Sequence, residues 1–323
     1  MDEMKQIGHF QFIDFIKGLA ILLVIVGHLI QGNATIGGGN NLIYGWIYMY
    51  HMGLFFACSG FLYKWKDDPS GIKPFLVELY KKTARLLIPF LIWGLIMHIY
   101  DDREWKFIES IQYIIIHPHY GLWFLQSLLK YYVLIIFINY ISFKLNGICK
   151  HARGMIILLV LVVSVFYHCG HKFAFIVDWN FCMFLIGLIL RQYTRLWEIA
   201  NNKFLSTMSA AGLFLPLFIN FPFKEIVSIS ALLSFIAIAQ TNTVPRFIKT
   251  QIEDIGKKSM PIYLLHFFFV IRICQLDLFA NQVFEFFFLL ALSVIIACCS
   301  IIIYRNLSFG MLPMLLWGEK KTF

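Results

Sequence analysis

One apolar stretch near the N-terminus carries a carboxylate, an ammonium group and an imidazole. These groups belong to Asp14, Lys17 and His28. At about 100° per residue, Lys17 and His28 lie within roughly 20° of each other on a helix, and Asp14 lies within about 60° of both. An imidazole can move protons near neutral pH, and an ammonium group attracts a phosphate or a developing oxyanion. A charge near the bilayer centre costs roughly 2.5–3.5 kcal/mol and normally faces protein or a water-filled cavity, so this face predicts a functional site.

The composition of the chain indicates the class of protein that must position this helix. Of its 323 residues, 60% are hydrophobic and only 14% are charged, whereas soluble domains usually carry about 25% charged residues. A soluble core cannot absorb this much apolar surface, so we expect a polytopic protein embedded in a lipid bilayer. The net charge of +9 comes from Lys and Arg in short loops between apolar runs. There these residues set topology, which argues against nucleic-acid binding.

Ten apolar runs are long enough to cross about 30 Å of hydrocarbon as helices. Their approximate limits are 12–30, 42–63, 86–100, 121–142, 154–168, 172–190, 204–221, 226–241, 259–276 and 283–304. The fifth run is short and the turn after it is tight, so nine or eleven spans remain alternatives. With both termini cytoplasmic, 21 of the 27 Lys and Arg lie inside and five outside, as the positive-inside rule requires. We therefore predict an all-α polytopic membrane protein with about ten transmembrane helices and both termini cytoplasmic.

The same pattern predicts one domain. Apolar runs fill residues 12–304, and no long hydrophilic stretch separates them. We expect residues 1–323 to form a single membrane-embedded domain with its core at 12–304 and no separate soluble domain. The seven Cys contain no C-x-x-C pair, and no metal site is predicted.

Several other segments place polar side chains in or beside apolar runs. The second run holds His51 and Ser59, the third begins at Arg85, and the ninth holds Tyr263 and His266. Each has a plain structural explanation, because small and polar residues also serve helix packing and hydrogen bonds between membrane helices.

Aromatic residues gather toward one membrane interface at Trp46, Tyr48, Tyr50, Tyr120 and Trp123. An aromatic belt accounts for them. A platform on which a sugar ring stacks is the alternative, since an aromatic face suits the apolar side of a pyranose.

Taken in order, five motifs resemble the acyltransferase 3 family of integral membrane acyltransferases, in its sugar O-acetylase-like subgroup without a fused soluble domain. The motifs are Asp14-x-x-Lys17-Gly18-x-Ala20 ending in His28; His51 with Phe55-Phe56 and Ser59-Gly60-Phe61-Leu62; Arg85-x-x-x-Pro89; Trp123-Phe124-Leu125; and Ser259-x-x-Ile262-Tyr263-Leu264-Leu265-His266. The chain departs from the commonest pattern twice. Lys17 stands where most members have Arg, and Gly53 stands where Pro often follows His-Met.

The resemblance implies transfer of an acyl group, most often acetyl, from cytoplasmic acyl-CoA to a sugar hydroxyl. The acceptor would be a surface polysaccharide or a lipid-linked sugar. The protein would reside in a bacterial cytoplasmic membrane. Acetyl-CoA would be a co-substrate, with no cofactor bound permanently. The essential basic residue of the family corresponds to Lys17 and its essential histidine to His28.

The residue types and their spacing suggest separate roles in catalysis and in CoA binding. A sugar hydroxyl needs a base as it attacks a thioester, and a histidine with a pKa of about 6.5 suits that role. We expect His28 to be this base. Lys17 lies about 16 Å along the helix from His28, so Lys17 and Arg85 are expected to hold the phosphates of CoA while pantetheine spans the gap.

Other mechanisms and functions stay open. An acyl-enzyme relay through Ser59, Tyr263 or His28 itself is an alternative to direct transfer. His51, Ser59, Tyr263, His266 and Asp14 are further candidates for catalysis or for the acceptor site. A transporter or flippase for an anionic or lipid-linked substrate and a membrane scaffold are the alternatives from other classes of protein.

Overall fold

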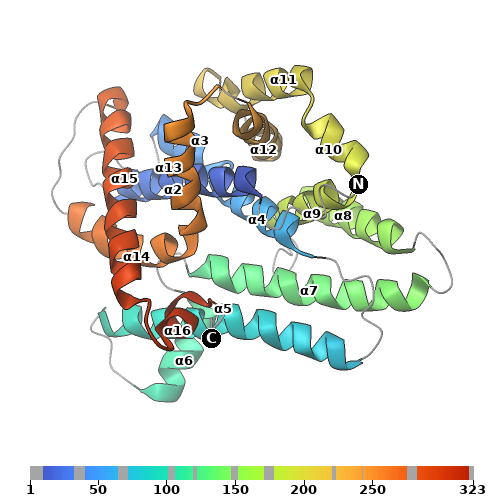
Figure 1. Cartoon of the computed structure of the whole chain (residues 1–323), viewed down its shortest axis with the longest axis horizontal. Coiled ribbons are helices and arrows are strands. Elements are labelled where there is room, and N and C mark those ends of the chain that lie inside the picture. The colour runs from blue at the N-terminus through green and yellow to red at the C-terminus, as the bar shows by residue number, and fades with distance from the viewer. Residues whose placement is uncertain are drawn as a thin grey trace. The chain divides into compact units, whose positions relative to one another are not determined.

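In a computed structural model of the chain, the described residues are 10–32, 41–64, 72–100, 106–118, 122–146, 152–170, 178–219, 223–241, 243–274 and 282–319. They form helices and contain no strand, which confirms the predicted all-α class (Figure 1). The α-helices are α2 (Gln11–Gly32), α3 (Leu42–Tyr48), α4 (His51–Leu62), α5 (Ile72–Tyr100), α6 (Phe107–Ile116), α7 (Trp123–Asn146), α8 (Ala152–Gly170), α9 (Trp179–Gln192), α10 (Thr194–Ala200), α11 (Lys203–Phe214), α12 (Lys224–Gln240), α13 (Arg246–Lys257), α14 (Ser259–Cys274), α15 (Gln282–Leu307) and α16 (Leu312–Trp317). A 3₁₀ turn, Leu215–Leu217, follows α11.

A helix overlaps each of the ten apolar runs, although the second run is broken between α3 and α4. Among the described residues, the helical stretches long and apolar enough to cross a membrane are Gln11–Gly32, Ile72–Tyr100, Trp123–Leu145 and Phe287–Leu307. Shorter apolar stretches are Ile156–Val165, Trp179–Gln192, Phe204–Leu217 and Ser259–Cys274. The chain is thus a helical membrane protein. The count of ten spans and the cytoplasmic termini stay predictions.

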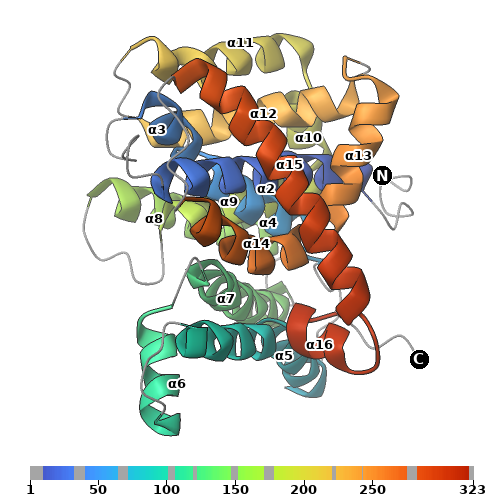
Figure 2. The same cartoon turned by 90° about the vertical axis from the view of Figure 1, so that its left-hand side faces the viewer.

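The chain divides into two compact units, 1–63 with 182–302 and 64–181 with 303–323. The first unit is built around α2, against which α4, α12, α13 and α14 pack (Figures 1 and 2). Within the most apolar window of α2, 83% of the residues are buried inside the protein. A predominantly apolar helix buried to this extent is a core helix rather than a lipid-facing one. The prediction of one domain with its core at 12–304 stays a prediction.

Two glycines bring α13 against the end of α2 that holds Asp14 and Lys17. A Cβ added at Gly18 would come closer than 3.0 Å to the backbone of Ile252, and one at Gly256 would come equally close to the backbone of Asp14. Small residues permit such approach between membrane helices. Because α13 is too polar to count as a span, its place against α2 was not predicted.

The break between α3 and α4 sets two aromatic rings of the site beside each other. Tyr50 leaves helical geometry at the break, with φ −140° and ψ −23°. The ring centres of Tyr48 and His51 then lie 4.7 Å apart. At the start of α3, Asn41 Oδ1 accepts a hydrogen bond from the amide of Tyr44 at 3.0 Å and caps the helix.

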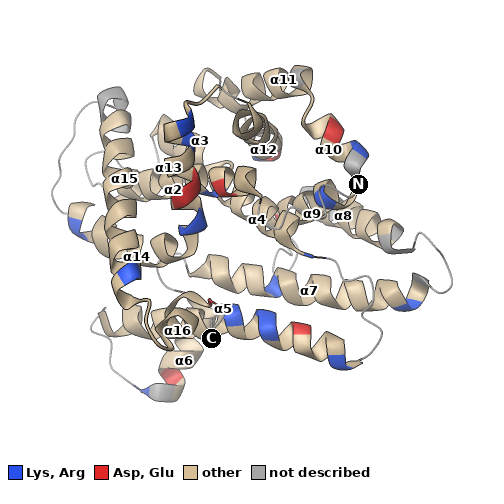
Figure 3. Cartoon of the chain, viewed as in Figure 1, with Lys and Arg blue, Asp and Glu red and all other residues tan. Residues whose placement is uncertain are grey.

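In the second unit, α7 and α16 both pack against α5. The indole N–H of Trp93 donates to the carbonyl of Leu316 at 2.8 Å, and its ring lies 5.5 Å from that of Trp317. The Lys and Arg residues of α5 lie in its N-terminal half, up to Arg85 (Figure 3). The apolar part of the helix therefore follows Arg85, as the sequence predicts.

Candidate active site

The N-terminal end of α2 holds the predicted acid–base pair. Nζ of Lys17 lies 2.8 Å from Oδ1 of Asp14, and the two side chains are 19% and 8% exposed. Their spacing of three residues on one helix brings them together. Asp14 balances the charge of Lys17, and the remaining ammonium hydrogens are able to contact a phosphate. On α13, Lys257 pairs with Asp254 at 2.7 Å, and this hydrogen bond raises the pKa of Lys257.

His28 lies toward the other end of α2, about 16 Å along the helix from Lys17. Its Nδ1 is 3.1 Å from Oε1 of Gln31 and 3.2 Å from the hydroxyl oxygen of Tyr48. The hydroxyl of Tyr48 donates to the same Gln31 oxygen at 2.9 Å. The imidazole is half-buried, and the ring centres of His266 and Phe267 lie 5.4 and 4.7 Å from its own.

His51 and His266 are buried imidazoles held by backbone carbonyls. Nδ1 of His51 lies 2.8 Å from the carbonyl oxygen of Ile47, and Nδ1 of His266 lies 2.6 Å from that of Tyr263. Because a carbonyl oxygen only accepts, both Nδ1 atoms carry hydrogen, and Nε2 of each neutral ring carries a lone pair. Nε2 of His266 is buried without a hydrogen-bond partner among the described residues. The fold thus gathers His28, His51 and His266 from α2, α4 and α14.

The structure brings Tyr263 to this cluster but not Ser59. The ring of Tyr263 is buried, with its centre 5.8 Å from that of His266. Ser59 lies two turns after His51 on α4, about 12 Å along the helix. Its hydroxyl donates to the carbonyl of Phe55 within the same helix at 2.8 Å. Of the two hydroxyls suggested as acyl carriers, only that of Tyr263 belongs to a residue beside the histidines.

Arg85 and Lys17 belong to different units. Arg85 lies on α5 in the second unit, where its backbone carbonyl lies against Gly318, and Lys17 lies on α2 in the first. Gly318 has φ +64°, a left-handed conformation that suits glycine at the end of α16. The shared role of Lys17 and Arg85 at one CoA molecule stays a prediction.

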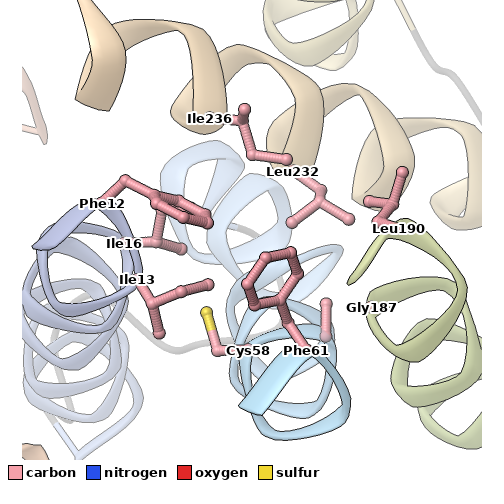
Figure 4. A pocket seen from close by; sticks show the side chains of 10 residues that line it. Phe12, Ile13, Ile16, Cys58, Phe61, Gly187, Leu190, Leu232 and Ile236 are labelled. Carbon is pink, nitrogen blue, oxygen red and sulfur yellow. The ribbon is translucent and has the colours of Figure 1, made fainter. Parts of the chain in front are cut away.

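A small apolar pocket lies near the N-terminal end of α2, among α2, α4, α9 and α12 (Figure 4). Its lining includes Ile13 and Ile16 of α2, Cys58 and Phe61 of α4, and Leu232 of α12. None of the side chains that line it is charged. Its chemistry therefore suits hydrocarbon rather than the phosphates of CoA.

Gln31 and Tyr48 are contacts of His28 that sequence reasoning did not assign to the site. Gln31 follows His28 by three residues on one helix, a spacing that brings side chains together, so a signal for it existed. Tyr48 stands 20 residues away and was predicted as a residue of the aromatic belt or of a sugar-stacking platform, not as a partner of His28. The fold alone places it beside His28.

The part of the chain that the structure describes contains no group of three His, Cys, Asp or Glu placed to hold a metal ion. The side chains around His28 offer proton transfer and hydrogen bonding as their own chemistry.

The amino-acid sequence is similar to those of known proteins. The sequence model of an acyltransferase domain matches residues 10–305. A Nodulation protein NolL from Mesorhizobium japonicum is 38% identical over 86 residues, which are 25% of this chain and 21% of that protein. A Nodulation protein NolL from Sinorhizobium fredii is 37% identical over 86 residues, 25% of this chain and 22% of that protein. The match thus spans about a fifth of the length of these relatives. No solved structure matches the chain.

Proposed function

Because this chain belongs to the acyltransferase family whose model matches residues 10–305, we propose that it is a membrane O-acetyltransferase of a bacterial cytoplasmic membrane. It takes an acetyl group from cytoplasmic acetyl-CoA and transfers it to a hydroxyl of a surface polysaccharide or a lipid-linked sugar. Membership in the family supports acyl transfer over the transporter or flippase alternative. The choice of acetyl group and of a carbohydrate acceptor rests on the sequence motifs and their resemblance.

The observation that carries the proposal is the position of His28. Its Nδ1 faces Gln31 and Tyr48, at 3.1 and 3.2 Å, so Nε2 is the nitrogen available to a substrate. Two more imidazoles, of His51 and His266, lie in the same cluster. General-base assistance by a positioned histidine accelerates a reaction by about 10²–10⁴-fold.

The proposed step conserves protons and electron pairs. Nε2 of His28 takes the proton of the acceptor hydroxyl while the hydroxyl oxygen attacks the thioester carbonyl. The tetrahedral intermediate collapses and the carbon–sulfur bond breaks. The CoA sulfur leaves with the electron pair and takes the proton back from His28. The products are the acetyl ester and CoA as a free thiol, and His28 is again neutral.

Lys17 is assigned to binding of the acyl donor, acetyl-CoA, rather than to contact with the reacting atoms. It lies about 16 Å along α2 from His28, too far to share one atom with it. Its side chain is 19% exposed and its ammonium group is paired with Asp14, so it can hold a phosphate of CoA as a point charge. Direct transfer is preferred to a relay through Ser59, whose hydroxyl donates within its own helix at 2.8 Å.

Labelled donor separates the enzyme from the transporter. Membranes from cells with the full-length chain, or with empty vector, receive acetyl-CoA labelled with ¹⁴C in the acetyl group or in pantetheine. The proposal predicts that only acetyl label enters the glycan and lipid fractions, with one CoA thiol released per ester formed. Label taken up into sealed vesicles without thiol release would instead establish transport.

A further inference from the structure

We propose that Gln31 and Tyr48 are positioning residues, which hold hydrogen on Nδ1 of His28 and so present Nε2 to the acceptor hydroxyl. The inference rests on the proposed function of His28 as base. Among the described residues, the hydrogen-bond partners of His28 are these two side chains, at 3.1 and 3.2 Å from Nδ1. Neither comes from one of the sequence motifs.

The proton positions around His28 follow from the three distances. Oε1 of Gln31 accepts only, and it receives the hydroxyl hydrogen of Tyr48 at 2.9 Å. Tyr48 has a single hydroxyl hydrogen, so its oxygen faces Nδ1 of His28 with lone pairs. Both neighbours of Nδ1 therefore accept, which requires that Nδ1 donates. In neutral His28 the lone pair is then on Nε2.

The backbone around Tyr48 is arranged so that its ring can reach α2. A Cβ added at Gly27 would lie 2.9 Å from Cε2 of Tyr48, so glycine leaves room for the ring one residue before His28. The ring of Tyr44, one turn earlier on α3, lies 4.0 Å from that of Tyr48, centre to centre. Asn41 caps the helix that carries both tyrosines. The ring of Tyr48 thus packs against both Gly27 and Tyr44.

The groups that face His28 are uncharged hydrogen-bond partners or further titratable groups. Tyr48 of α3 and His266 of α14 lie against His28, and Tyr44 and His51 lie against Tyr48 in turn. The thiol of Cys274 on α14 donates to the carbonyl of Leu29, the residue after His28, at 3.6 Å. The close contacts of α13 are at the opposite end of α2. An amide therefore orients this imidazole, where the Ser-His-Asp triad uses a carboxylate.

Changing the amide to a carboxylate gives the proposal a specific signature. Gln31→Glu keeps an acceptor at Nδ1 but adds a negative charge, which stabilises the imidazolium form. We expect the acid limb of the rate–pH profile to move to higher pH by about 1–2 units, because an adjacent opposite charge has effects of that order. Gln31→Ala is expected to lower kcat by about 10–100-fold with an unchanged KM for acetyl-CoA, as loss of an orienting partner does at metal-bound histidines.

The experiment measures acetyl transfer from [¹⁴C]acetyl-CoA against pH in membranes that contain the full chain. The variants are Gln31→Glu, Gln31→Ala, Tyr48→Phe and His28→Ala, with Gln240→Glu as a control because Gln240 is exposed on α12. Tyr48→Phe is expected to lower kcat by about 3–10-fold, since Gln31 still contacts Nδ1. Protein levels are equalised by quantitative immunoblot.

The outcomes separate the positioning role of Gln31 and Tyr48 from the proposed role of His28 as base. A shifted acid limb for Gln31→Glu beside a normal profile for Gln240→Glu supports the positioning role. A wild-type profile for Gln31→Glu, with His28→Ala inactive, overturns the positioning role and leaves His28 as base. Full activity of His28→Ala overturns both. If Gln31→Ala fails to accumulate, the nearly isosteric Gln31→Glu and Tyr48→Phe decide in its place.

Discussion

Replacing Gly18 with alanine is expected to push α13 away from α2 beside the Lys17–Asp14 pair. The added Cβ would lie 2.8 Å from Cγ2 of Ile252 and closer still to the backbone of that residue. A backbone cannot yield as a side chain does, so α13 has to move by about 1 Å, and overpacking of this kind costs about 1–3 kcal/mol. A displacement of about 1 Å far from the chemistry lowers a rate by as much as about 100-fold.

The assay compares thermal unfolding in detergent and the KM for acetyl-CoA of Gly18→Ala with those of Gly45→Ala. A Cβ at Gly45 would meet nothing within 4 Å, so alanine there should stabilise α3 by about 0.5–1 kcal/mol. Gly18→Ala should unfold several degrees below the wild type and show a raised KM. If the two variants unfold alike, α13 does not contact α2 through its backbone, and the argument from Gly18 is wrong.

Three further predictions concern Lys17, Ser59 and the C-terminus. Lys17→Gln should raise the KM for acetyl-CoA by about tenfold or more, because it removes the charge and the 2.8 Å partner of buried Asp14. Lys17→Arg keeps the charge, so its KM should stay within about threefold of wild type. An unchanged KM in Lys17→Gln would remove Lys17 from the donor site. Ser59→Ala should keep near-wild-type kcat, since the hydroxyl donates within α4 at 2.8 Å, whereas inactivity at normal protein levels would restore the relay. A green fluorescent protein fused to the C-terminus should fluoresce and a fused alkaline phosphatase should stay inactive, as a cytoplasmic end requires; the reverse pattern would refute the predicted topology.

The long apolar helices were predictable because hydropathy reports directly on burial and on membrane insertion. The run 12–30 corresponds to α2, Gln11–Gly32, and the run 121–142 to α7, Trp123–Asn146. The run 42–63 looked continuous because the residues at its break, Met49 and Tyr50, are themselves apolar or aromatic. The polar residue beside the break, His51, does not interrupt the run, and hydropathy carries no signal for a change of backbone direction.

The candidate site was predictable where its residues share a helix and not where separate helices meet. Helical periodicity placed Asp14 and Lys17 on one face, and the ion pair between them confirms that arrangement. The proximity of His28 to His266 at 5.4 Å and to Tyr48 depends on how α2, α3 and α14 pack. Packing of this kind depends on shape rather than on periodicity.

The central claim is that His28 serves acyl transfer, and mass spectrometry of glycans tests it most directly. Surface and lipid-linked glycans are extracted from cells with the wild type, His28→Ala or His117→Ala, the last a control on the second unit. We predict an acetyl mass increment with the wild type and His117→Ala, and its loss with His28→Ala at equal protein levels. An equal increment with His28→Ala would contradict the account.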